Sequence, residues 1–152
     1  MNLQIKSIIV YLIAALISLM FSADTCKAGE AAPYTKDAYV RIEKAVKDYK
    51  PPRPSDSATP IEKQKAAIEM FLEIFRLAGY DFDATIRKVA HDVKNNPDKV
   101  PRDSENVATM IVILMSYIKS HCEYEHVNCL ECFDYQTSES IKWLWGNTEF
   151  KP

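Results

Sequence analysis

The stretch from Val107 to Cys132 reads VATMIVILMSYIKSHCEYEHVNCLEC and decides the fold. Its first part, as far as Ile118, carries apolar residues on nearly every side of a helix. A helix of that kind is stable in water only when other helices surround it. We therefore expect a central helix that is capped by Asp103 or Ser104 and continues to about Ser120, with the rest of the chain as its packing partners.

The segment from Thr59 to Gly79 carries the clearest helix start in the sequence. Thr59 is suited to cap the helix, Pro60 to occupy its first position, and Glu62 to complete a capping box. Gly79 can end the helix, because glycine readily adopts the left-handed conformation of a C-terminal cap. The expected buried face comprises Ile61, Ile68, Phe71, Leu72, Phe75 and Ala78.

Two further helices flank this one in the sequence. The first runs from Thr35 to Lys50, with Thr35 as its cap. Its apolar stripe consists of Tyr39, Ile42, Val46 and Tyr49, at helical spacings of three and four. The other helix begins at Asp81 or Asp83 and stops at Asn95 to Pro97.

The remaining segments connect or end these helices. Residues 29–33 read as a mobile tail, and residues 51–60 as an extended proline-rich connector. A last short helix is capped by Thr137 or Ser138 and closed by Gly146. No alternating strand pattern is found. The sequence predicts an all-α, single-domain bundle of four or five helices, with a Cys/His-rich turn after the central helix.

The N-terminus has the pattern of a secretory signal peptide over residues 1–28. A positive charge at Lys6 precedes an apolar run from Ile8 to Phe21, and a short polar tail follows. Ala23 and Ala28 compete as cleavage sites, and Ala28 fits better because small side chains stand at both required positions. We expect an exported helical domain over residues 29–152, periplasmic or extracellular, with no stable membrane span after cleavage.

Charge and motifs narrow the classes of function. The formal net charge is −2, and no basic patch or stripe indicates a nucleic-acid partner. No nucleophile motif, phosphate-binding loop or HExxH helix is present. His91 has no partner at a catalytic spacing and reads as a surface histidine near a helix end. We therefore expect that the protein is not an enzyme.

The cluster after the central helix has the pattern C-x3-H-x2-C-x2-C, preceded directly by His121. Exported thiols tend to oxidise, so a disulfide from Cys122 to either Cys129 or Cys132 is expected across the turn. Cleavage after Ala28 would leave one cysteine over. That cysteine could stay as a buried thiol or link two copies of the chain into a homodimer, whereas cleavage after Ala23 would keep Cys26 as its partner.

The alternative interpretation of the cluster is a metal or thiol-redox site. Thiolate and imidazole are the ligands that zinc prefers. The candidate ligands are His121, Cys122, His126, Cys129 and Cys132. The C-x2-C spacing also matches a redox dithiol, although no βαβ pattern surrounds it. The leading interpretation has no cofactor, and zinc belongs to this alternative.

The class of function that remains is binding to another protein, as an inhibitor, an immunity-type protein or an accessory of a secretion system. The candidate contact residues are His126, Trp143, Trp145 and Phe150, because turns and exposed aromatic side chains often carry binding. We expect one tryptophan in the core and the other exposed, since residues two apart cannot share a helical face.

One short motif within the cluster is similar to a known family. The ending CLECF at residues 129–133 is similar to the Cys-Leu-Asp stretch of the helical periplasmic amidase-immunity family. The similarity covers only a few residues, and the cysteine that such proteins carry in their first helix has no counterpart here. It therefore assigns no family.

Overall fold

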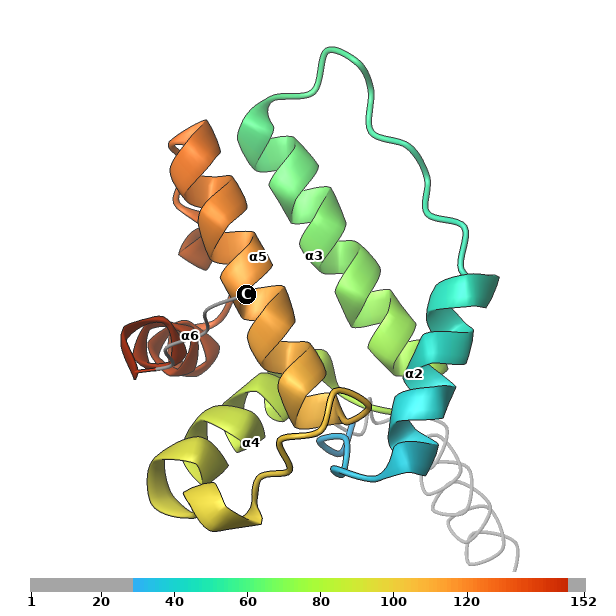
Figure 1. Cartoon of the computed structure of the whole chain (residues 1–152). Helices are drawn as coiled ribbons and strands as arrows, with labels where there is room; N and C mark the ends of the chain where they lie inside the picture. The colour runs from blue at the N-terminus through green and yellow to red at the C-terminus, as the bar shows by residue number, and fades with distance from the viewer. Residues whose placement is uncertain (1–28, 148–152) are drawn as a thin grey trace, which may run out of the picture.

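Residues 29–147 are described by a computed structural model of the chain, and the expected signal peptide and Phe150 lie outside them. Within this range the fold is all-α, as predicted, and Figure 1 shows the arrangement. The helices are α2 (Lys36–Asp48), α3 (Pro60–Leu77), α4 (Phe82–Asn95), α5 (Val107–Glu125) and α6 (Tyr135–Asn147). Two short 3-10 helices, η1 (Pro97–Lys99) and η2 (Cys129–Cys132), lie between them.

Side-chain caps start the first three of these helices where the sequence predicts. The Thr59 hydroxyl accepts a hydrogen bond from the Glu62 N–H, and the Glu62 carboxylate accepts one from the Thr59 N–H at 2.8 Å, which completes the capping box of α3. Thr35 caps α2, and the Asp81 carboxylate caps α4 by accepting from the Ala84 N–H at 2.7 Å.

The predicted caps of the last two helices are wrong. Asn106 caps α5, where its side-chain oxygen accepts from the Thr109 N–H at 2.9 Å. The Asp134 carboxylate accepts from the Thr137 N–H at 2.7 Å, so α6 begins before Thr137, and this residue is buried inside it. Gly146 lies within α6 instead of ending it. Asn and Asp are as good at capping as Ser and Thr, so composition alone could not choose among neighbours.

Residues 29–34, which we call the N-terminal arm, bond to residues along α4 from its cap Asp81 to Asp92, so the prediction of a mobile tail is wrong. The N–H of Asp81 donates to the carbonyl of Glu30 at 3.0 Å. The N–H of Ala32, whose residue is fully buried, donates to the Thr85 hydroxyl at 3.0 Å. The Tyr34 hydroxyl donates to the Asp92 carboxylate at 2.8 Å. The arm is therefore part of the fold.

One cluster of buried apolar side chains, contributed by every α-helix within residues 29–147, forms the core. On α2 the buried residues are Ala38, Ile42 and Ala45, whereas Val46 is half exposed, so the predicted stripe is rotated toward the alanines. On α3 and its C-cap the prediction holds for Ile68, Phe75 and Ala78. Ile61 and Phe71 are half-buried, and Leu72 is exposed. The rings of Phe75 and Phe82 contact each other with centroids 4.9 Å apart, which joins α3 to α4.

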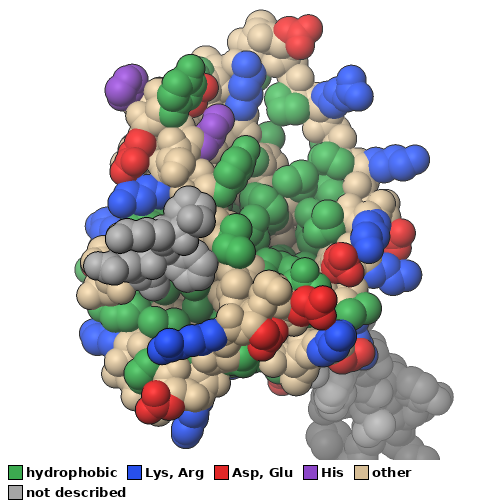
Figure 2. Space-filling model, in the orientation of Figure 1, with side chains coloured by type: hydrophobic (Ala, Val, Ile, Leu, Met, Phe, Trp, Pro, Cys, Tyr) green, Lys and Arg blue, Asp and Glu red, His purple; other side chains and the backbone are tan. Residues whose placement is uncertain are grey.

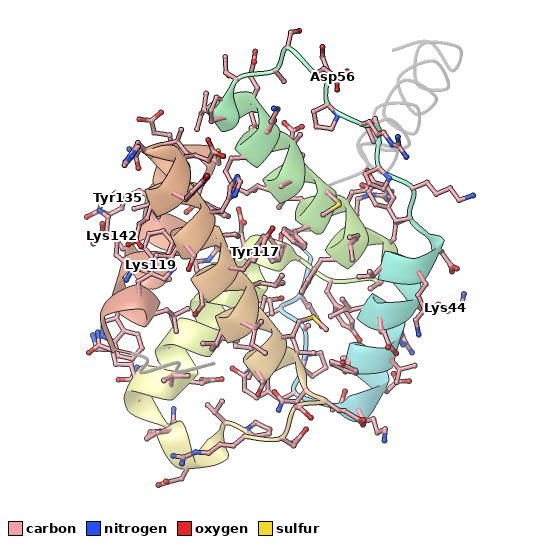
Figure 3. The ribbon with its side chains drawn as sticks, turned by 45° about the horizontal axis from the view of Figure 1, so that its top comes forward. Lys44, Asp56, Tyr117, Lys119, Tyr135 and Lys142 are labelled. Atoms are coloured by element: carbon pink, nitrogen blue, oxygen red, sulfur yellow. A yellow bond between two sulfur atoms is a disulfide. The ribbon has the colours of Figure 1, made fainter. Side chains whose placement is uncertain are left out.

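The helices do not all pack against one another. α4 packs against α6, α5 contacts both of them, and α3 contacts α2, α4 and η2. The long helices α3 and α5 run side by side in both ribbon views (Figures 1 and 3), yet they are not a closely packed pair within the described residues. The proline-rich connector between α2 and α3 extends away from the body of the bundle.

Candidate functional site

The Cys/His cluster contains a disulfide between Cys122 and Cys129, which confirms one of the two predicted pairings. Their Cα atoms are 6.0 Å apart, a normal separation for a disulfide. Both residues are buried, with 5% and 2% of their surface exposed. The bond joins the last turn of α5 to η2 and so fixes the turn between these elements.

Cys132 is the one free cysteine among the described residues, and it is half-buried. Burial raises the pKa of its thiol, and the nearby carboxylates of Glu131 and Glu69 raise it further against the opposing effect of Lys65. A thiol with a raised pKa is a poor nucleophile at neutral pH, because the thiolate is the reactive form. This environment favours an inert thiol over a redox-active one.

The two histidines of the cluster, His121 and His126, lie in different environments. His126 is exposed and adopts the left-handed conformation, with φ of 54°, as the C-cap of α5. The His121 ring stacks on Tyr117, with centroids 6.4 Å apart and planes inclined by 10°. Within residues 29–147 no group of three or more His, Cys, Asp or Glu side chains is close enough to hold a metal ion. In the oxidised state two of the candidate zinc ligands are joined to each other.

A groove of about 410 Å³ brings several of the predicted residues together. His126, Trp145 and both disulfide cysteines line it, along with residues of α5 and η2. The Trp145 indole N–H donates to the Met115 carbonyl at 2.8 Å, which holds that ring against α5. The disulfide between Cys122 and Cys129 thus holds one side of the groove in place.

Trp143 lies elsewhere, on the wall of a second groove between α4 and α6. Both tryptophans are half-buried, so the expectation of one in the core and one exposed is wrong. Trp143 and Trp145 project from different sides of α6, as their spacing requires. The structure therefore divides the predicted contact residues between two grooves instead of gathering them in one.

Three large apolar side chains of α5 are exposed, and the sequence analysis missed this surface. Ile113, Tyr117 and Tyr124 are 52%, 66% and 79% exposed. Residues three and four apart lie on the same side of a helix, so these side chains share one face with their uncharged neighbours. We call this set the open face of α5: Thr109, Met110, Ile113, Leu114, Ser116, Tyr117, Ser120, His121 and Tyr124.

The open face carries no Asp, Glu, Lys or Arg over the length of α5. The charged residues of the helix stand to either side, and Lys119 forms an ion pair with Glu123 at 3.8 Å. Figure 2 shows hydrophobic side chains gathered over α3 and α5, with a hollow between the two helices. Figure 3 places Tyr117 on the side of α5 that faces α3. The prediction that other helices surround α5 on all sides is therefore wrong.

Comparisons of the chain with protein-family models, curated protein sequences and solved structures gave no match. None of the helices in the described part of the chain is long and apolar enough to cross a lipid bilayer.

Proposed function

We propose that the protein is an exported protein-binding domain, and that the open face of α5 is its main contact surface. The observation that carries this proposal is the exposure of Ile113 and Tyr117 on the helix whose composition most requires burial. A helix that is apolar nearly all round is normally covered on every side. Here the described chain leaves one side uncovered, and a partner protein supplies the missing neighbour.

The composition of the open face fits a protein partner. Tyrosine is enriched in protein interfaces because its ring supplies contact area and its hydroxyl supplies a hydrogen bond. Charged residues are depleted at the centres of interfaces, and the open face has none of the four charged types. Covering each large apolar side chain contributes up to about 1.5–3 kcal/mol, so a few such anchors support stable binding.

Export is the second part of the proposal, and two observations support it. Residues 1–28 have the pattern of a signal peptide, and Cys122 and Cys129 are paired in the fold. Disulfides persist in the periplasm and outside the cell, and they are rare in reducing compartments. Cell fractionation with intact-mass measurement tests this part. We expect a chain that begins at Gly29 with the mass deficit of one disulfide, and a full-length reduced chain would contradict it.

The experiment for the binding surface is site-specific photo-crosslinking in the exporting cell. A benzophenone amino acid replaces Ile113 or Tyr117 in two variants, and Tyr135 in the matched control. Tyr135 is 79% exposed but lies on α6, outside the open face. We expect discrete protein adducts from the two α5 positions and none in common with the control. Adducts that are absent, or identical from all three positions, would contradict the proposal.

The identity of the adduct distinguishes the finer roles. A toxic enzyme of the cell envelope would make this protein an inhibitor or immunity protein, and a component of an export machine would make it an accessory factor. Activity of the adduct partner, measured with and without the purified protein, separates these outcomes. Loss of the partner's activity is the result expected for an inhibitor.

A further inference from the structure

The second groove, between α4 and α6, is lined by charged side chains, whereas the open face has none. It has a volume of about 590 Å³ and is open to solvent. Arg87, His91 and Lys94 line it from α4, at spacings of four and three that place them on one side of the helix. Glu139, Lys142 and Trp143 line it from α6, where Lys142 and Trp143 stand three and four residues after Glu139. Its lining thus carries three permanent positive charges against one negative charge.

The positive charges differ in how far they are already neutralised. Arg87 donates to the Thr137 hydroxyl at 2.7 Å and to the Asp134 carboxylate at 3.2 Å, which holds its guanidinium in place. Lys142 pairs with Glu139 at 2.7 Å. Lys94 has no ion pair within residues 29–147. Among the described residues, the groove therefore presents the ammonium group of Lys94 without a carboxylate partner. The Arg87 guanidinium and the Lys142 ammonium group each have a single carboxylate partner and keep donor positions open.

Ala90 and half-buried Trp143 give the lining of the groove an apolar part. An aromatic wall beside positive charges suits a ligand that combines carboxylates with an apolar or aromatic side chain. The open shape of the groove favours an extended segment of chain, because small-molecule sites usually enclose most of their ligand. These features select one class of ligand.

We propose that the groove between α4 and α6 binds an acidic segment of a polypeptide, with carboxylates at Lys94 and Lys142 and an apolar side chain against Trp143. This proposal does not depend on the open face, because the groove lies on other helices. Figure 3 shows Lys142 at the edge of α6, on the opposite side of the molecule from Lys44 of α2. Lys44 therefore provides a control position remote from the groove.

The test is a titration of the isotopically labelled protein with a capped Asp-Glu-Phe-Glu-Asp peptide. The N–H resonances of the protein are followed by NMR. The two tryptophans provide an internal control, since the Trp145 indole is bonded to Met115 and the Trp143 indole lines the groove. We expect a saturable shift of the Trp143 indole resonance and little change at Trp145. A peptide with Asn and Gln in place of Asp and Glu should give no saturable shift.

Two double variants with equal loss of charge complete the test. Lys94→Gln with Lys142→Gln should weaken peptide binding by about tenfold, because both charged contacts at the rim of the groove are lost. Lys44→Gln with Lys47→Gln, which removes two exposed ion-paired lysines from α2, should change it by less than about twofold. Equal weakening by both pairs, or no saturation, would overturn the proposal. Equally tight binding of inorganic phosphate would also overturn it, since the site would then hold any anion.

Discussion

Replacing Thr85 with valine removes one hydroxyl that ties the N-terminal arm to α4. Thr85 is fully buried, and its hydroxyl accepts from the Ala32 N–H at 3.0 Å while donating to the Asp81 carbonyl at 2.5 Å. Valine keeps nearly the same shape but can make neither hydrogen bond. The variant therefore isolates the polar contribution of this contact without opening a cavity.

The expected loss of stability depends on which hydrogen bonds the Asp81 carbonyl and the Ala32 N–H keep in the variant. The Asp81 carbonyl still accepts from the Thr85 N–H at 3.0 Å, so it stays satisfied. The Ala32 N–H is left buried without an acceptor, and an unsatisfied buried donor costs about 1–3 kcal/mol. We therefore expect Thr85→Val to lower the free energy of unfolding by about 2 kcal/mol.

The assay is urea denaturation followed by circular dichroism, with hydrogen exchange of the Ala32 amide as a local readout. The matched control is Ser140→Ala, which removes an exposed hydroxyl that bonds only to the Gln136 carbonyl of its own helix. We expect the control to cost less than about 0.5 kcal/mol. If Thr85→Val costs no more than the control, or leaves exchange at Ala32 unchanged, the arm is not part of the cooperative fold.

Three other changes have expected outcomes. His126→Gly should raise the free energy of unfolding by about 0.5–1 kcal/mol in urea denaturation, because glycine adopts the left-handed conformation of this exposed cap without strain. Replacing Cys122 and Cys129 with alanine should lower it by about 2.5 kcal/mol for a loop of this length, and an equal loss in the reduced wild-type protein would attribute the effect to the bond. Burial tends to raise the pKa of Asp92, but hydrogen bonds from Lys88, Tyr34 and His91 bring it to about 2. The stabilisation that this lowered pKa gives is complete above about pH 5 and is lost as the pH falls toward 2, and Tyr34→Phe should make that loss smaller in acid titrations of stability.

Local signals in the sequence predicted the early helices well. The capping box of α3 involves Thr59 and Glu62, which are three residues apart, so the sequence contains the whole interaction. The docking of the N-terminal arm could not be read in the same way, because Ala32 bonds to a hydroxyl 53 residues away. Small residues at a terminus look mobile until the surface that receives them is known.

The open face shows a different limit of sequence patterns. Apolar periodicity indicates which side chains gain by burial, but it does not say whether the chain itself provides the cover. Val107 and Ile111 are buried as expected, whereas Ile113 on the same helix is half exposed. For the cysteines, spacing left two pairings open, and the turn after α5 selected Cys129 over Cys132 because the turn brings its Cα within disulfide distance of Cys122.

The measurement that decides whether the open face binds a partner is the affinity for the crosslinked protein, once identified, by isothermal titration calorimetry. Tyr117→Lys places a charge at the centre of the open face. Tyr135→Lys makes the same change on α6, at a side chain that is 79% exposed against 66% for Tyr117. We expect Tyr117→Lys to weaken binding by at least about 30-fold, as for a central aromatic anchor, and Tyr135→Lys to change it by less than about threefold. Equal affinities of the two variants, with both folded as judged by circular dichroism, would contradict the proposed role of α5.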